Sequence, residues 1–457
     1  MSVARRAAFV AGVVIALIIA ATFTTTGAPR DRAVGTGTDV GTASTWYCAE
    51  GTSNPNGRAD EVIVLGNVGT TKSNALVTVF SGSDAAPVRR SVAVAAGAVA
   101  RVKVSDIVAV AEPGVLVEVR GGPTVVEHQI QRGTDQALGP CAREPVPRVS
   151  FAGGSTMKGA ELWLALFNPF PDDAIVDVRG VTGDGVRAPG ALQGVVVPRF
   201  SRLSVPVHEA IPRADLVAVE MTVRRGRAIA EQSLALDATD GRQGLALSEG
   251  GVASRRWAFP IGLTGSGHQE RLVLANRSNR DVRVTVRFAL DAAAAVEPES
   301  LILPGTTALA VDTKRVPPDV GFSVSIRADR PIVAEMVGAN GAPQPADVRG
   351  LAADLGFSVG ARRWAVVPAR LDAGSTDSLA IVSMDGRPHR VQVVRSDGPR
   401  PRVVARINVP ATGRQLVDLA KLVSGVNVAV TVRANGPVAV ERESTRPGLT
   451  RSRAIPG

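Results

Sequence analysis

Few residues in this sequence have the type and spacing of a known catalytic motif. Ser155 and Lys158 match the S-x-x-K motif of penicillin-binding proteins, in which a lysine one helical turn after a serine activates its hydroxyl. The partner motifs S-D-N and K-T-G are missing, and GGSTMKG aligns with EGTSNPNG, GLTGSG and DAGST in a sequence repeat. Because these aligned segments read as loops, we expect a turn at 155–158 and predict no catalytic residue.

Four glutamates recur at regular spacing and could form a carboxylate set for acid–base chemistry or calcium binding. Their spacings are 104, 104 and 106 residues, and they are Glu127, Glu231, Glu335 and Glu441. Each ends a predicted hairpin in a different repeat, so the four need not converge. We expect each carboxylate to accept backbone N–H groups or to pair with a nearby arginine, which is a structural role.

Metal-binding residues are scarce in this chain. It has two cysteines and four histidines, and the histidines are His128, His208, His268 and His389. They fall at different points of their repeats, so we expect each to be solitary and predict no metal site and no cofactor. Cys48 and Cys141 bracket the first repeat and are predicted to form a disulfide. The loop that it closes would make it worth roughly 4–5 kcal/mol, and it suits an exported protein.

Four repeats must position these residues. Aromatic anchors open the repeats at intervals of 105, 106 and 107 residues, and they are Trp46, Phe151, Trp257 and Trp364. A later strand of each repeat ends in a small polar residue, namely Asn67, Asn168, Asn276 and Ser383. The anchors predict buried side chains, and the asparagines predict Asx turns.

Strand patterning indicates the fold class. Each repeat of about 105 residues has some seven short alternating segments separated by turn residues, which predicts an all-β, immunoglobulin-like β-sandwich. A closed, propeller-like pseudo-symmetric arrangement is the alternative. The predicted sandwiches span 46–147, 148–254, 255–361 and 362–446, and a basic tail covers 447–457. The ends of the repeats include linkers rich in Gly, Ala and Pro, namely 238–254 and 340–356, and parts of them should pair along neighbouring sheets.

The N-terminus predicts the compartment. Between Arg6 and Arg30 lie 23 uncharged residues, apolar enough to cross a bilayer as a helix. We predict a cytoplasmic segment (1–6), a transmembrane signal-anchor helix (7–28) and a flexible linker (29–45). The basic residues before the helix place the repeats outside the cytoplasm, in a single-pass protein of the cell membrane. Cleavage of the helix as a signal peptide, which would give a secreted protein, is the alternative.

Positive charge is abundant but scattered. The net charge is +10, and arginine supplies 47 of the 52 basic residues. The densest cluster without an acid is Arg446, Arg451 and Arg453 near the C-terminus. Aromatic residues make up only 4% of the chain, so we predict no nucleic-acid partner. Outside the cell such a surface would meet lipid headgroups and envelope polymers.

The repeat motifs carry a family resemblance. The segments WYCAEGT, LGN and the VEH, AEQ and AEM triplets resemble the repeats of uncharacterised actinobacterial exported proteins, the family called domain of unknown function 5719. The resemblance runs from Trp46 to about Glu443. Cys48 stands where the family pattern has an aromatic residue, and Asn-Pro is intact only at Asn168-Pro169. This resemblance implies no activity.

These features predict a non-enzymatic, membrane-anchored, extracytoplasmic scaffold or interaction protein of the bacterial cell envelope. It would contact the cytoplasmic membrane through its helix, and envelope polymers or envelope proteins through loops at the ends of its sandwiches. One alternative is a carbohydrate or envelope-polymer binding module, which would present a row of exposed aromatics. The other is an accessory subunit of an envelope enzyme, which would hold two close carboxylates of shifted pKa in a cleft.

Overall fold

A computed structural model describes most of the chain beyond its N-terminus. The described residues are 43–457, apart from 240, 292–295, 312, 314, 369–375, 399, 424–427 and 446–447. The predicted cytoplasmic segment and anchor helix, with most of the linker, lie outside them. None of the helices in the described part has the length and apolar character needed to span a bilayer.

Each repeat forms two antiparallel sheets that share one core, and we call the repeats units. In the first unit, the sheet we name the rim sheet has the strand order β1 (Ala43–Cys48), β6 (Gly114–Arg120), β3 (Ser73–Phe80), β4 (Val88–Val94). The inner sheet has the order β5 (Val99–Lys103), β2 (Asp60–Asn67), β7 (Thr124–Arg132), β8 (Asp135–Pro140). Apolar side chains from both sheets, such as Val117 and Ile63, are fully buried in a single cluster.

The other units repeat this order. The rim sheet of the second unit has the order β9 (Arg148–Gly154), β15 (Val217–Arg225), β11 (Ala174–Thr182), and β11 also pairs with β12 (Gly185–Arg187) and β13 (Val195–Val197). The rim sheet of the third unit has the order β18 (Ser254–Leu263), β23 (Gly321–Asn340), β20 (Val282–Leu290), β21 (Glu299–Leu303). The rim sheet of the fourth unit has the order β25 (Ala361–Val366), β30 (Val430–Thr445), β27 (His389–Arg395), β28 (Arg402–Val409). The inner sheet of the second unit has the order β14 (Ser201–Pro206), β10 (Ala160–Asn168), β16 (Ile229–Thr239), β17 (Arg242–Ser248). The inner sheet of the third unit has the order β22 (Ala308–Val311), β19 (His268–Ala275), β23, β24 (Gly350–Leu355). The inner sheet of the fourth unit has the order β29 (Arg414–Asp418), β26 (Thr376–Ser383), β30, β31 (Thr450–Arg453). The long strands β23 and β30 run through both sheets of their units. One-turn helices, α2 (Val207–Ala210) and α3 (Leu419–Leu422), follow β14 and β29.

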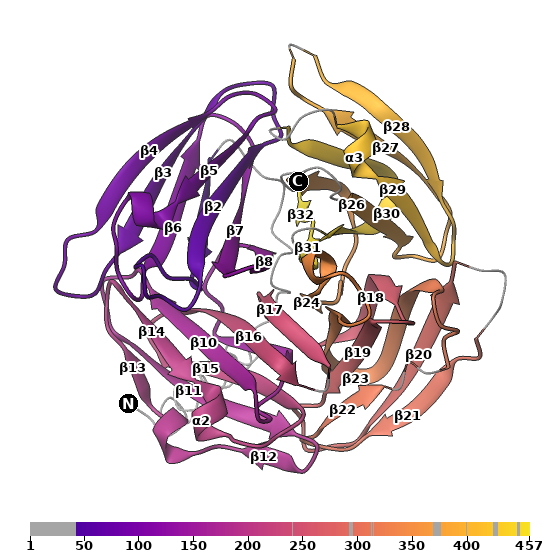
Figure 1. Cartoon of the computed structure of the whole chain (residues 1–457), viewed down its shortest axis with the longest axis horizontal. Helices are drawn as coiled ribbons and strands as arrows, with labels where there is room; N and C mark the ends of the chain where they lie inside the picture. Colours follow the sequence, from indigo (N-terminus) through magenta and orange to yellow (C-terminus); the bar gives the residue numbers. More distant parts are fainter. Residues whose placement is uncertain are drawn as a thin grey trace, which may run out of the picture. The chain divides into compact units, whose positions relative to one another are not determined.

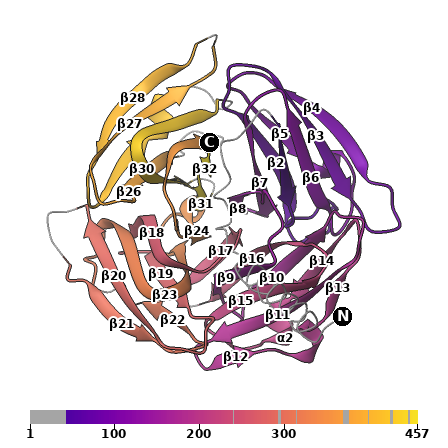
Figure 2. The ribbon, with the colours of Figure 1, turned by 180° about the vertical axis from the view of Figure 1, so that it is seen from behind.

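The four units are arranged like the blades of a propeller (Figure 1, Figure 2). The innermost strands β8, β17, β24 and β31 surround the centre, and each contacts the next around the ring. The prediction of an all-β chain is confirmed, and the arrangement is the propeller-like alternative. The immunoglobulin-like assignment of the single units is not confirmed.

The predicted linkers and the predicted tail supply three of the four innermost strands. β17 and β24 come from segments predicted as linkers, and they pair with β16 and β23 of their own units. The predicted basic tail 447–457 is wrong as a tail, because β31 pairs with β30 and β32 (Ile455–Pro456) pairs with β25. The physical reason is that every inner sheet has a fourth strand beyond the hairpin, and in the fourth unit β31 forms that strand.

The ring closes between the fourth unit and the first through short contacts. Ala98 forms an isolated bridge with Val428, and the backbone N–H of Ala429 donates to Gly97 O at 2.8 Å. A guanidinium nitrogen of Arg101 donates to Pro368 O at 3.3 Å. Within the described ranges, the first and last strands pair inside their own units, so closure depends on these contacts and on side chains at the junction.

We expect Gly97→Ala to weaken this closure. Gly97 has a φ of +69°, and a Cβ there would lie 2.4 Å from the backbone nitrogen of Asp397 in the fourth unit. Gly133, with a φ of +61°, has nothing within 4 Å of such a Cβ and is the matched control. Gly133→Ala should lose about 1–2 kcal/mol through left-handed backbone alone. Gly97→Ala should lose a further ~1–3 kcal/mol through the clash, and equal losses in urea unfolding would contradict this.

Candidate functional site

The four recurring glutamates meet at the junctions between units. All four are buried, and three of them accept backbone N–H groups from the unit that precedes their own. The N–H groups that donate to them belong to residues two to four positions after the aromatic anchor of that preceding unit. We call Glu127, Glu231, Glu335 and Glu441 the junction glutamates. The expected structural role agrees with these contacts, but the contacts join units, which the sequence did not predict.

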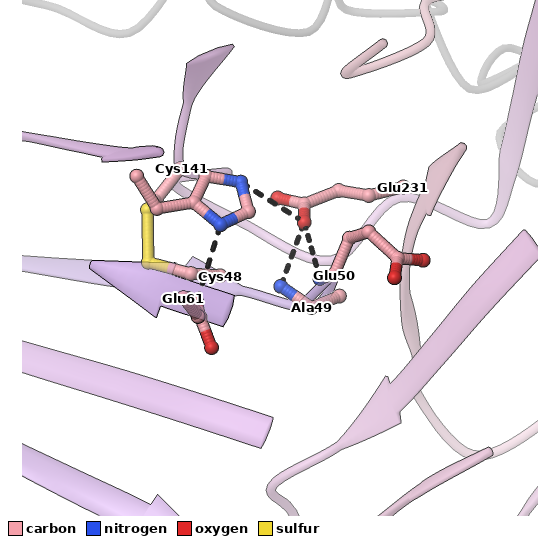
Figure 3. Close-up of a disulfide and its surroundings, with 7 residues drawn as sticks. Cys48, Ala49, Glu50, Glu61, Cys141 and Glu231 are labelled. Carbon is pink, nitrogen blue, oxygen red and sulfur yellow. Dashed lines mark hydrogen bonds and ion pairs between the residues drawn. A yellow bond between two sulfur atoms is a disulfide. The ribbon is translucent and has the colours of Figure 1, made fainter. Parts of the chain in front are cut away.

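Glu231 lies at the best-defined junction (Figure 3). Its Oε2 accepts the backbone N–H groups of Ala49 and Glu50, both at 2.8 Å. The same oxygen is 3.3 Å from Nε2 of His128, while Nδ1 of His128 is 3.2 Å from Oε1 of Glu61. The expectation that His128 is solitary is therefore wrong. Pairing of β2 with β7 places its ring beside Glu61, and the second unit adds Glu231.

The glutamates at the other three junctions have different sets of partners. Glu335 accepts the backbone N–H of Gly153 and the hydroxyl of Ser248. Glu441 accepts the N–H of Ile261 at 3.1 Å. At the closing junction, Glu127 is 3.5 Å from the hydroxyl of Ser452 and 3.9 Å from a guanidinium nitrogen of Arg442.

Burial raises the pKa of several junction carboxyls. It raises the pKa of Glu61 to about 7, against the opposing pull of His128. It also raises the pKa of Asp354 to about 7, against Arg451, and burial together with the charge of Asp354 raises the pKa of Glu441. Burial would lower the pKa of His128, but Glu231 and Glu61 outweigh it and raise that pKa to about 10.

We expect stability to fall as pH rises. A group whose pKa is raised on folding contributes most below its unfolded pKa and loses that contribution as pH passes its folded pKa. This window runs from 6.5 to about 10 for His128 and from 4.5 to about 7 for Glu61. In urea unfolding between pH 5.5 and 9.5 the free energy of unfolding should decline, and His128→Gln should flatten the decline above pH 6.5. His208→Gln is the control, and slopes indistinguishable among the three proteins would contradict the expectation.

The disulfide lies beside this cluster. Cys48 and Cys141 are joined, which confirms the predicted pairing, and both are buried in the first unit. Ligand atoms of Cys48, Cys141 and His128 all lie within 4.8 Å of one another. Because the sulfurs are bonded to each other, they present no thiolates, so this oxidised set lacks the donors that zinc requires.

Arginines hold further carboxylates at the junctions. Arg202 of the second unit binds Glu50 of the first at 3.0 Å. Arg451 of the fourth unit binds both oxygens of Glu270 in the third, at 2.6 and 3.0 Å, and Arg453 pairs with Glu249. These last two arginines lie in the predicted basic tail 447–457, which is wrong as a tail because β31 carries both of them into the ring.

A second recurring buried acid was not predicted from the sequence. It lies six residues before the small polar residue that ends a strand in each repeat. Glu61, Glu270 and Asp377 stand there in three of the four units, and all are buried. Their cations are His128, Arg451 and, at 3.8 Å, Arg442. The signal was present, because each acid is the second or third residue of a strand whose later residues are mostly apolar.

The remaining predicted residues have structural positions. The anchors are buried, with exposed fractions of 0–2% for Trp46, Phe151, Trp257 and Trp364. Asn67, Asn168 and Asn276 each accept the N–H two residues ahead, as an Asx turn requires, and Ser383 donates to Asp385. Ser155 lies in a loop between β9 and β10 rather than at a helix start, and its hydroxyl is 3.5 Å from the N–H of Met157.

The other three histidines are not part of the cluster formed by His128, Glu61 and Glu231. Nδ1 of His208 is 3.0 Å from Leu162 O, and Nε2 of His389 is 2.8 Å from Asp385. His268 lines an open depression of about 570 Å³ on the third unit, together with Glu270 and Arg271. Its Nδ1 contacts Asn340, Glu270 is held by Arg451, and Arg271 pairs with Asp215, so these polar groups are already engaged within the protein.

Comparisons place the chain among known sequences. The model of a family described as Family of unknown function (DUF5719) matches residues 139–402. No curated protein matches the chain. A solved structure titled "Crystal Structure of Thermotoga maritima 1070" is 18% identical, with 23% of this chain and 94% of that one covered and a TM-score of 0.21.

Two further solved structures were compared. One is titled "Anabaena sensory rhodopsin transducer", with 21% identity, 18% and 82% coverage and a TM-score of 0.17. The other is a "tetra-tandem repeat in extending region of large adhesion protein", with 12% identity, 90% and 99% coverage and a TM-score of 0.10. At such low TM-scores these likenesses carry no weight for this chain.

Proposed function

Because this chain belongs to DUF5719, a family of unknown function, we propose its role from its own geometry. The role is that of a non-enzymatic scaffold or interaction protein of the bacterial cell envelope, anchored to the membrane by residues 7–28 with its repeats outside the cytoplasm. The observation that carries the proposal is the use of the recurring glutamates. All four are buried at contacts between units, and three of them accept backbone N–H groups there, so the residues best suited to acid–base work serve to join the ring.

The disulfide supports an extracytoplasmic location. Buried disulfides persist in oxidising compartments and are rare in the cytosol. The anchor helix itself rests on the sequence alone, through Arg5, Arg6 and the uncharged run that follows them.

The alternatives have less support. Among the described residues, the exposed large hydrophobic side chains are all aliphatic or methionine, and these are Val88, Met157, Val186, Val196, Ile302, Val359, Val403 and Leu416. A carbohydrate module would need an aromatic row there. Asp354 and Glu441 are two interacting carboxyls with raised pKa values, which is the feature expected of an enzyme accessory. Each is at most 4% exposed, however, and neither lines the depression on the third unit.

Crosslinking in intact cells tests the proposed role. A photoreactive amino acid is placed at the exposed rim positions Val186, Ile302 or Val403, in the full chain and in the Ser155→Ala variant. We expect light-dependent adducts with envelope components at one or more positions, unchanged by Ser155→Ala. Protease added to spheroplasts should degrade the repeats and spare a cytoplasmic marker.

Two outcomes would overturn the proposal. Repeats that resist protease until the spheroplasts are lysed would place them inside the cell. Labelling of Ser155 by a serine-reactive probe, with no rim adduct at any position, would instead make the S-x-x-K loop an active site.

A further inference from the structure

Arginines face one another across neighbouring strands in the rim sheets of the third and fourth units. Arg256 of β18 is directly opposite Arg327 of β23, and Arg363 of β25 is directly opposite Arg433 of β30. All four side chains are exposed. Across the part of the chain that the structure describes, no acidic side chain forms an ion pair with any of them.

Such pairs work against the fold. Like charges directly opposite each other in an antiparallel sheet are destabilising. The two pairs nevertheless occupy the same address, since Arg363 follows Arg256 by 107 residues and Arg433 follows Arg327 by 106. The first and second units show that the fold does not need them, because Thr45 faces Glu118 and Ser150 faces Glu220 at this address.

Each pair belongs to a longer row. In the third unit, Arg327 is also opposite Thr285 of β20, which lies between the exposed Arg283 and Arg287 on the same face. Asp329 lies beside this row, and its carboxylate accepts the backbone N–H of Arg283.

The fourth unit repeats the pattern. Arg433 is opposite Gln392 of β27, Gln392 is opposite the exposed Arg406 of β28, and Arg390 precedes Gln392 on the same face. We call the two sets, Arg256, Arg283, Arg287 and Arg327 with Arg363, Arg390, Arg406 and Arg433, the arginine rows.

We propose that the arginine rows bind a flexible anionic polymer with repeating phosphodiester groups. The inference rests on the proposed extracytoplasmic interaction role and names its partner. Arginine binds phosphate through two parallel N–H donors, which makes it suited to this group. Opposite and diagonal positions in a sheet lie roughly 5 and 7–8 Å apart, so several guanidinium groups can engage successive phosphates.

The position of the rows favours a flexible chain over a flat or rigid partner. Strands β20 and β21 of the third unit and β27 and β28 of the fourth lie on the outer edge of the ring in both views (Figure 1, Figure 2). They occupy successive sectors of that edge. A flexible polymer can follow both rows around the ring, whereas a flat bilayer or a stiff duplex would meet one sector at a time.

Binding of fluorescent poly(glycerol phosphate) to the purified full chain in neutral detergent tests the proposal. The test variant carries Arg327→Glu and Arg433→Glu, which copy the residue that the first and second units have at this address. The control carries Arg89→Glu and Arg90→Glu on the exposed β4, with the same change in net charge. We expect the test variant to bind at least tenfold more weakly, with the salt slope reduced by about 1–2, and the control to change less than threefold.

Each contrary outcome overturns the proposal. Equal losses in both variants would reduce the effect to net charge. Stronger binding to anionic vesicles or to duplex DNA than to the polymer would assign the rows to another partner. A polycarboxylate bound as tightly as the polyphosphodiester would remove the phosphate assignment. Failure here would leave the topology and serine-probe results unaffected, so it is distinguishable from failure of the proposed scaffold role.

Discussion

Replacing Cys48 and Cys141 together by alanine should lower the free energy of unfolding by about 4–5 kcal/mol, because the bridge closes a loop of 93 residues in the unfolded chain. Reductant should destabilise the wild-type protein by a similar amount and leave the variant unchanged. The measurement is urea unfolding with and without a dithiol. A variant as stable as the oxidised wild type would contradict the expectation.

The ring determines how far this loss spreads. If the repeats were separate sandwiches, only residues 46–147 would be destabilised. The cores are continuous across junctions, since the cluster that holds Cys48 also contains Val367, Ala429 and Ile455 of the fourth unit. We therefore expect hydrogen exchange in the variant to increase in β7, in β25 and around Glu231 as well. An increase confined to the first unit would show that the units unfold independently.

The sequence allowed much of the local structure to be predicted, because local structure depends on period and turn chemistry. Alternating segments gave strands, and asparagine at a strand end gave an Asx turn. The spacing of the aromatic anchors gave the number of units. The pairing of Cys48 with Cys141 followed because only one pairing was possible.

The relations between units could not be predicted, because they depend on closure of the ring. A regular spacing of glutamates indicates one address, but not that this address faces the preceding unit. His128 seemed solitary because its partner Glu231 lies more than 100 residues ahead. The C-terminal arginines were predicted to form a tail because the carboxylate that binds Arg451, that of Glu270, lies 181 residues earlier in the sequence.

Glu270 and Arg451 carry the second large effect that we expect. Arg451 is 5% exposed and binds Glu270 with two hydrogen bonds and Glu443 with a third, at 2.8 Å. Removing one partner of a buried ion pair leaves an uncompensated charge and typically costs 3–5 kcal/mol. Arg451→Ala should therefore lose about 3–5 kcal/mol in urea unfolding. Arg132→Ala, which breaks the half-exposed pair with Glu161, should lose at most about 1 kcal/mol.

A double variant separates the charge from the strand that carries it. Arg451→Met with Glu270→Met removes both charges while keeping side chains of similar length between β31 and β19, and apolar replacement of a buried pair is often neutral. We expect this double variant to recover part of the stability that Arg451→Ala loses, because Glu270 no longer leaves a buried charge while Glu443 still loses its partner. If it is as unstable as the single variant, the loss comes from packing of β31, and the ion pair does not hold the third and fourth units together. If Arg451→Ala is no worse than Arg132→Ala, neither the pair nor the strand position stabilises this junction.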